Sequence, residues 1–244
     1  MAGGVKVGCC WFPVGRSQYA ARLKVVELQQ TFYSPPRLET ARRWRETAPG
    51  DFEFTLKAWQ LITHEASSPT YRRLKRPLPP EERGQSGSFR DTPVVHRAWE
   101  VTRDLARALK ARLVVFQCPA RFTPTGENME RLRRFFSRVE RDHLIFAWEP
   151  RGAWPREEVA ALCRQLNLVS ALDPFASAPF PGPLAYFRLH GLGGYRYTYT
   201  DEDLAVLAAM VAGGQETYVM FNNMSMWADA RRFQEVLARA GAAV

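Results

Sequence analysis

The sequence predicts an α/β fold, an eight-stranded parallel (β/α)8 barrel of the TIM type, and three observations predict it. Short apolar runs alternate with amphipathic stretches along the whole chain, which is typical of repeated β/α units. The apolar runs number eight. The length of 244 residues suits one such barrel, which usually needs about 250 residues. No segment has the character of an interdomain linker, so we expect a single domain over residues 1–244.

The expected strands are the apolar runs themselves. They are Val5–Cys9, Lys24–Leu28, Phe52–Lys57, Leu113–Gln117, Leu144–Trp148, Leu168–Leu172, Leu184–His190 and Tyr218–Asn222. The expected helices are Leu38–Thr47, Val94–Ala111, Asn128–Arg141, Arg156–Leu166, Asp201–Ala212 and Trp227–Ala240. Asp201 is expected to cap its helix, and Gly241 to end the last one. Two connections, Trp11–Leu23 and Pro174–Pro183, offer little room for a helix.

One long irregular connection follows the third strand, over His64–Thr92. It is rich in proline and glycine and too long for an ordinary loop. In a barrel, a loop that follows a strand rises from the face that carries the active site. We therefore expect a lid or binding loop, and its run Tyr71–Arg76 is the densest group of cations in the chain.

The charge and the apolar content of the chain limit the kinds of partner and the compartment that we expect. The net charge is +9, which fits nucleic acid or another anionic partner and equally an arginine-rich solvated surface. No apolar run approaches the roughly 18 residues of a membrane span, and Met1–Gly8 does not resemble a secretory signal. We expect a cytoplasmic protein without membrane contact. The four cysteines match no zinc-binding spacing and are expected to be buried free thiols.

Side-chain parity in the strands predicts where the chemistry lies. Alternate residues of a barrel strand face the helices and the interior. In the seventh strand Phe187 and Leu189 suit the helix side, which turns Arg188 and His190 inward. Most other strands also end in a polar or ionisable residue after an apolar run. Because strand carboxyl ends build the active sites of barrels, we expect these residues to line one polar, arginine-containing pocket.

Two roles are expected for the residues of this pocket. The candidate catalytic residues are Glu27, Lys57, Glu149 and His190. The candidate substrate-binding residues are Tyr33, His64, Gln117, Arg151, Trp154, Asp173, Arg188, Tyr195, Asn222 and Asn223. The alternative is a structural ring of ion pairs such as Glu27–Lys57 and Glu149–Arg188, because buried charges need partners.

Several motifs in the same order resemble the YecE-like family, DUF72, a domain of unknown function. The resemblance runs from the first expected strand to the last helix and so covers nearly the whole chain. Its motifs are Val26–Tyr33, Phe54–Ala58, Ile62–His64, Phe116–Phe122, Glu149–Arg151 with Trp154, Tyr186–Gly191 and Phe221–Asn223. The resemblance implies a β/α barrel but no settled activity. The chain departs from the family in a short segment before Val26, in Gln29-Gln30 where Asn-Ser is usual, and in Gly152 where a histidine often stands.

Two functions follow as hypotheses. The first is an enzyme of hydrolase, lyase or isomerase type that acts on a small phosphorylated or carboxylated substrate by acid/base chemistry, with arginine forks holding the anion. The second is a nucleic-acid binding or processing barrel with a shape like endonuclease IV, since Tyr71–Arg76 and Tyr195–Tyr199 mix cations with aromatic rings. No cofactor is predicted, although His64, His190 and nearby carboxylates leave room for a single divalent metal ion. The sequence leaves the oligomeric state open.

Overall fold

The computed structural model describes residues 4–241, and within this range eight strands close into a barrel in chain order. They are β1 (Val5–Cys9), β2 (Val25–Leu28), β3 (Glu53–Lys57), β4 (Leu113–Gln117), β5 (Ile145–Glu149), β6 (Val169–Leu172), β7 (Leu184–Leu189) and β8 (Glu216–Phe221). Neighbouring strands run parallel, for example β4 with β5 and β7 with β8. The predicted fold class is confirmed. Residues 1–3 and 242–244, which belong to the single domain expected from the sequence, lie outside the described range.

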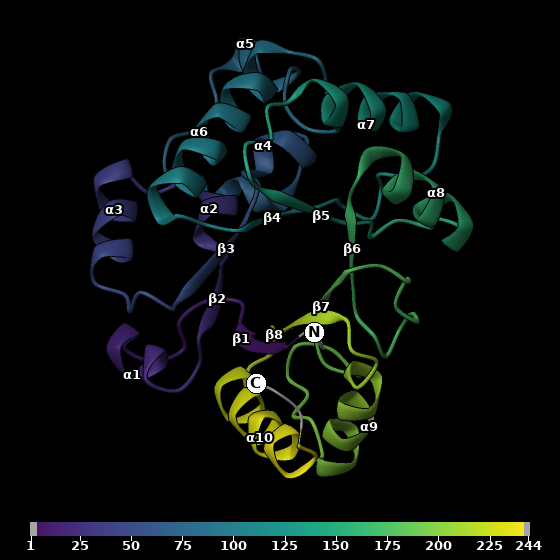
Figure 1. Ribbon diagram of the computed structural model, residues 1–244. Coiled ribbons are helices and arrows are strands. Elements are labelled where there is room, and N and C mark those ends of the chain that lie inside the picture. Colours follow the sequence, from purple (N-terminus) through teal and green to yellow (C-terminus); the bar gives the residue numbers. More distant parts are fainter. Residues whose placement is uncertain (1–3, 242–244) are drawn as a thin grey trace. The chain divides into compact units, whose positions relative to one another are not determined.

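Contacts divide the chain into two compact units. The terminal unit comprises residues 1–27, 48–53 and 169–244. Its helices are α1 (Arg16–Ala20), α9 (Asp201–Val211) and α10 (Met226–Arg239). In this unit β7 pairs with β6 and β8, and β8 pairs with β1. Helices α9 and α10 lie side by side in Figure 1, and α10 packs on β1 and β8. Phe233 of α10 contacts Phe221 at a ring-centroid distance of 6.0 Å.

The central unit comprises residues 28–47 and 54–168 and contains β3, β4 and β5. Its helical segments are α2 (Gln30–Tyr33), α3 (Leu38–Glu46), α4 (Gln60–Thr63), η1 (Pro69–Arg73, a 3-10 helix), α5 (Pro80–Arg83), α6 (Pro93–Leu109), α7 (Gly126–Arg138) and α8 (Arg156–Leu166). Phe116 of β4 and Phe146 of β5 pack against Trp99 of α6 and Phe136 of α7. Phe116 and Phe146 therefore face the helices. Because side chains alternate along a strand, Gln117 and Glu149 face the opposite side, as the parity of the sequence predicts.

The boundaries differ from the predicted ones in small, explicable ways. Asp201 is not the N-cap of α9: the prediction is wrong, because Thr200 takes that position and its hydroxyl accepts a hydrogen bond from the backbone N–H of Asp203. Thr200 and Asp203 form a reciprocal capping box. Gly241 follows α10 with φ +69°, as expected of a residue that ends a helix. The short helices α2, α4 and α5 were not predicted, because four residues give no readable helical period.

Two further properties follow from the described residues. All four cysteines are buried and free, as predicted, and burial raises the pKa of the Cys9 thiol to about 12. Between residues 4 and 241, no helix combines the length and the hydrophobicity needed to cross a membrane.

Candidate functional site

In the terminal unit, Arg188 and Glu27 form a fully buried ion pair. The Arg188 side chain points inward from β7, and both side chains have zero exposed surface. Its Nε donates to Glu27 Oε2 at 2.9 Å, and its Nη2 donates to Oε1 at 2.7 Å. The Tyr186 hydroxyl adds a third hydrogen bond to Glu27, at 3.0 Å. This fork-to-fork geometry fits a structural counter-ion, with Glu27 rather than Glu149 as the carboxylate. A role for Arg188 in anion binding stays a prediction.

The end of β7 is tied to the end of β6 through backbone hydrogen bonds. Asp173 Oδ2 accepts from the backbone N–H of His190 at 3.3 Å, and Oδ1 accepts from that of Phe175 at 3.1 Å. Asp173 and His190 are both half-buried. The half-buried Asn222 continues the β8 ladder, because its backbone N–H donates to Leu189 O at 2.8 Å. These residues therefore lie at the carboxyl ends of their strands, as the sequence predicts.

Asn223 holds a neighbouring loop and lies away from solvent. Its Nδ2 donates to Tyr197 O and to Asp229 Oδ2, both at 2.7 Å, and its side chain is fully buried. Tyr195, in the same loop, is 55% exposed. A Cβ at Gly191 would lie 2.3 Å from Gly194 O, so the turn after β7 requires this glycine.

In the central unit, Lys57 lies among aromatic rings at the end of β3. Its Nζ is 3.6 Å from the ring centroid of Phe32 and 5.9 Å from that of Tyr33, and the residue is only 4% exposed. Arg73 of η1 also contacts Tyr33, and its guanidinium carbon lies 3.6 Å from the Tyr33 ring centroid. Cation–π contacts of this kind are strongest where water is displaced.

His64 follows α4 and is 4% exposed. Its Nδ1 shares a hydrogen bond with the Thr63 hydroxyl at 2.8 Å, and its ring stands edge-on to Phe32 with centroids 4.9 Å apart. The Tyr71 hydroxyl donates to His64 O at 2.8 Å. Burial lowers the pKa of His64 to about 3, and the positive charges of Lys57 and Arg121 lower it further. The imidazole is therefore neutral across the physiological range.

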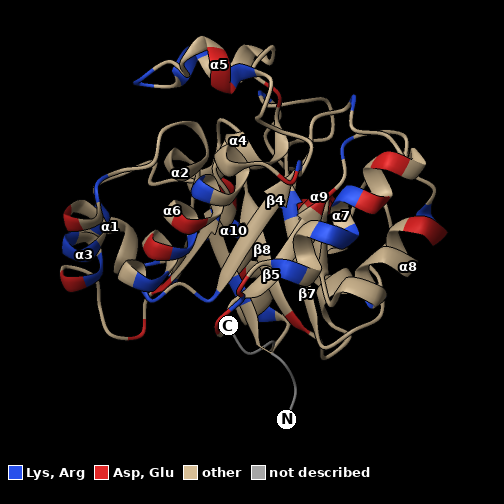
Figure 2. Cartoon of the chain, turned by 90° about the horizontal axis from the view of Figure 1, so that it is seen from above, with Lys and Arg blue, Asp and Glu red and all other residues tan. Residues whose placement is uncertain are grey.

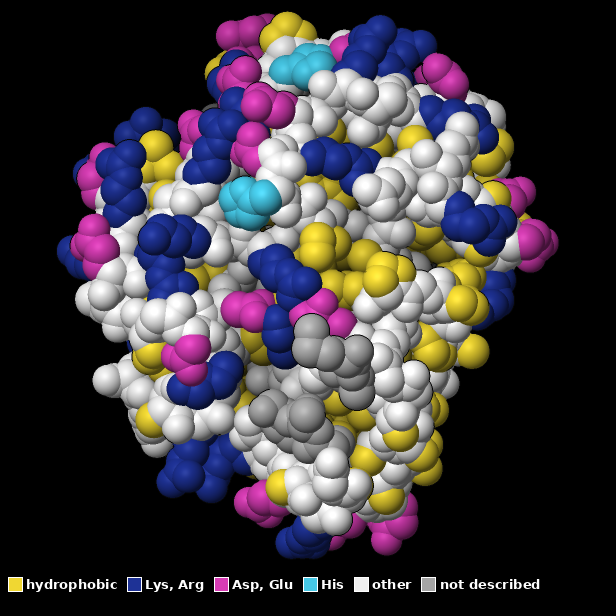
Figure 3. Space-filling view, in the orientation of Figure 1, with side chains coloured by type: hydrophobic (Ala, Val, Ile, Leu, Met, Phe, Trp, Pro, Cys, Tyr) yellow, Lys and Arg dark blue, Asp and Glu magenta, His cyan; other side chains and the backbone are white. Residues whose placement is uncertain are grey.

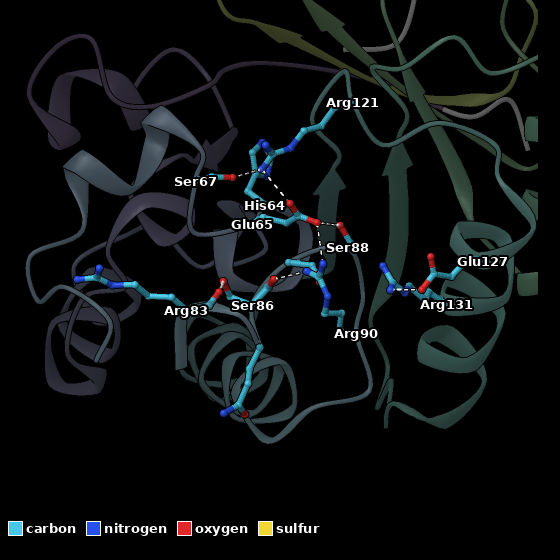
Figure 4. Close-up of polar contacts among 12 residues, drawn as sticks. His64, Glu65, Ser67, Arg83, Ser86, Ser88, Arg90, Arg121, Glu127 and Arg131 are labelled. Carbon is cyan, nitrogen blue, oxygen red and sulfur yellow. Dashed lines mark hydrogen bonds and ion pairs between the residues drawn. The ribbon is translucent and has the colours of Figure 1, made fainter. Parts of the chain in front are cut away.

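Arg121 reaches the same place from the loop after β4 (Figure 4). Its Nη2 donates to Ser67 Oγ at 2.9 Å and lies 3.4 Å from Glu65 Oε2. Glu65 also accepts from Arg90 Nη2 at 2.8 Å, and this hydrogen bond is the main influence that lowers its pKa against the effect of burial. Arg121 was not among the predicted site residues. The signal was its position four residues beyond the end of a strand, within the motif Phe116–Phe122.

Glu149 and Arg151 form a second pair in the central unit. Arg151 Nε donates to Glu149 Oε1 at 2.6 Å. Gln117 is the direct cross-strand partner of Glu149 in the β4–β5 ladder. Trp154 uses its Nε1 to donate to Phe122 O at 2.7 Å, which fixes its ring in the loop after β5.

The predicted residues therefore fall into local groups. Lys57, Tyr33 and His64 lie together with the unpredicted Arg121 and Phe32. We call Lys57, His64 and Arg121, with the rings of Phe32 and Tyr33, the cationic cluster. Among residues 4–241, no group of three or more histidine, cysteine or carboxylate side chains is arranged to hold a metal ion. The cationic cluster is suited to bind an anion and to exchange a proton at His64.

Comparison with known proteins places the chain in a family. The family model DUF72, described as a protein of unknown function, matches residues 16–244. The chain belongs to the DUF72 family. A DUF72 protein of Thermotoga maritima is 22% identical, with a TM-score of 0.71 over 96% of this chain and 99% of that one. One from Enterococcus faecalis is 18% identical, with a TM-score of 0.70 over 96% and 95%.

The barrel also occurs in other proteins of similar fold. Endonuclease IV from Thermus thermophilus is 13% identical, with a TM-score of 0.54 over 97% of this chain and 98% of that one. At this identity the likeness concerns the fold alone. Comparison with curated proteins gives no match.

Proposed function

We propose that this DUF72 protein is an enzyme that binds a small anionic polar substrate at the cationic cluster and transforms it by acid/base chemistry. The observation that supports this is the neutral, buried His64, whose pKa is lowered to about 3 by burial and by the charges of Lys57 and Arg121. Burial is the largest cause of this low pKa, and the charges of Lys57 and Arg121 add a positive potential at the ring. A phosphate or carboxylate placed there would gain from both cations.

The residues of the cluster divide the task. The Lys57 ammonium and the Arg121 guanidinium hold the anionic group, and the Phe32 and Tyr33 rings wall the site. Thr63 fixes the orientation of the imidazole through Nδ1, which leaves Nε2 to accept or donate a proton. A bound anion offsets the positive potential and raises the pKa of His64, bringing it closer to the range where proton transfer is efficient near neutral pH.

Glu149 is the second acid/base candidate, because its carboxylate is held in one orientation by Arg151. Acid/base roles of Glu27 and His190 stay separate predictions for the terminal unit, where Glu27 is already hydrogen-bonded to Arg188 and Tyr186. This chemistry is shared by hydrolases, lyases and isomerases, and the substrate is defined here by its charge and size.

Inorganic phosphate is the simplest probe of the anion site. We expect phosphate to raise the Tm of the wild-type protein by mass action. At a concentration of 100 Kd, the free energy of unfolding should rise by about 2.7 kcal/mol. Lys57→Met should lose most of this increase. Lys24→Met is the matched control, because Lys24 is exposed and pairs with Asp51 at the surface. Equal phosphate responses in all three proteins would contradict the anion site.

Proton uptake tests the acid/base part separately. Calorimetric titration of phosphate in two buffers of different ionisation enthalpy should show proton uptake on binding to the wild type. The uptake should disappear in His64→Gln while binding persists. Uptake that is unchanged in His64→Gln would assign the proton to another group.

A further inference from the structure

One cationic segment of the central unit has no role in the cationic cluster. Arg72, Arg73, Lys75 and Arg76 lie in η1 and the chain just after it, and all four side chains are exposed. We call these four residues the basic arm. Between residues 4 and 241, none of the four forms an ion pair; Arg73 contacts only the Tyr33 ring. Four positive charges in five positions repel one another, so an anion that lies along them is favoured.

Helix α7 of the same unit pairs cations with carboxylates. Arg131 pairs with Glu127 and Arg134 pairs with Glu130 one turn away, and Figure 2 shows both basic and acidic residues on this helix. The face in Figure 3 likewise mixes Lys and Arg with Asp and Glu. Glu82 of α5, which follows the arm in the sequence, pairs with Arg97 at 2.7 Å. The arm is therefore a local excess of charge rather than a sample of the general surface.

The arm is also held in position at both ends. At its start, the Ser68 side chain caps η1 and the Tyr71 hydroxyl donates to His64 O. At its end, Pro77, Pro79 and Pro80 restrict the backbone. Further on, the backbone N–H of Gly87 donates to Leu61 O at 2.7 Å. An arm anchored in this way presents its cations with less loss of conformational entropy on binding.

We propose that the basic arm binds the phosphate backbone of a single-stranded nucleic acid. Three of its four cations are arginines, whose planar forks match phosphate oxygens. Consecutive cations suit a polymer with one charge at each repeat. Tyr33 and Tyr71 lie at the base of the arm, and unpaired bases stack on tyrosine rings and on arginine planes. The arm and the cationic cluster share the Tyr33 ring but use different cations, so this proposal does not depend on the chemistry at the cluster.

The test is the salt dependence of binding to a fluorescently labelled oligothymidylate, measured by anisotropy on the whole chain. Each phosphate neutralised on a single strand contributes about 0.7 to the slope of log K against log salt. Arg72→Gln/Arg76→Gln should lower the slope by about 1.4 and weaken binding at least about tenfold at roughly 50 mM salt. The control is Arg42→Gln/Arg43→Gln on α3, which removes two equally exposed cations without ion pairs.

Three results would overturn the proposal. The first is no binding by the wild type at low salt. The second is an equal loss in the α3 control, which would assign binding to net charge. The third is displacement of the oligonucleotide by polyglutamate of equal charge as efficiently as by unlabelled oligothymidylate, which would assign the arm to acidic peptides. Phosphate stabilisation through Lys57 should be unchanged in the arm variant, so failure here is separable from failure of the cationic cluster.

Discussion

The two units place ionisable residues at strand carboxyl ends in opposite electrostatic states. In the terminal unit, Arg188 is matched to Glu27 through two hydrogen bonds, with both side chains at zero exposure. In the central unit, burial lowers the pKa of His64 most, and the positive charges of Lys57 and Arg121 lower it further. In the first arrangement one cation faces one carboxylate, whereas in the second two cations, Lys57 and Arg121, act on one neutral imidazole. We propose the anion site in the central unit because an anion placed there would interact with both cations.

Of the changes considered, removal of Arg188 should lower the free energy of unfolding most, because it breaks the buried pair with Glu27. Arg188→Met leaves Glu27 buried without its guanidinium, and loss of one partner of a buried pair costs about 3–5 kcal/mol. Chemical denaturation of both proteins measures this difference. Glu27→Leu/Arg188→Met removes both charges and should recover part of the loss, because two apolar side chains carry no desolvation penalty.

The same variant tests whether Arg188 also binds anions. If Arg188 serves only as a counter-ion, phosphate should raise the Tm of Arg188→Met as much as it raises that of the wild type. A phosphate response that disappears with Arg188 would move the anion site to the terminal unit and reverse the comparison above.

His64 should make the central unit sensitive to acid, with the next largest effect. Its pKa is about 3 in the folded chain against an ordinary value of 6.5. As the pH falls below 6.5, the unfolded chain takes up a proton that the folded chain does not, so stability decreases down to about pH 3 and then levels off. At about 1.36 kcal/mol for each pH unit, the loss between pH 6.5 and pH 4 is at most about 3.4 kcal/mol. Stability measured from pH 7 to 4 in the wild type and in His64→Gln checks this.

His143→Gln is the matched control for the acid effect, because His143 is exposed. It should retain the wild-type slope of stability against pH, whereas His64→Gln should show a smaller slope. Identical slopes in His64→Gln and the wild type would mean that carboxylates alone cause the acid sensitivity.

The fold could be predicted almost completely because apolar patterning is a local signal. Each strand of the described chain is found where an apolar run was expected, within two residues at each end. The one wrong cap, Asp201, shows the limit: three acidic residues follow Thr200, and only the geometry decides which side chain meets the first free N–H groups. Parity also predicted correctly that Arg188, Gln117 and Glu149 turn away from the helices.

Partner choice at the strand ends could not be predicted, because parity gives the side of a strand and not the distance to other groups. The sequence suggested Glu149 as the carboxylate for Arg188, and the structure places Glu27 there. The position of Arg121 just beyond β4 was a signal in the sequence, but it did not show which groups Arg121 meets. That depends on how the loop after β4 meets the chain after α4, where Ser67 and Glu65 contact the guanidinium.

The smallest effect we expect is a change in the titration of His64 itself. Lys57 contributes more than Arg121 to the low pKa, and burial contributes most. Lys57→Met should therefore raise the pKa of His64, Arg121→Gln should raise it less, and neither should restore the ordinary value, because the ring stays buried. The Hε1 resonance followed by NMR against pH gives all three values, and Lys24→Met supplies the control for a change in net charge. Titration of His64 that is the same in Lys57→Met and in the control would show that burial alone lowers its pKa. The positive potential on which the anion site rests would then be absent, while the hydrogen bond from Tyr71 and the packing against Phe32 would still account for the position of the ring.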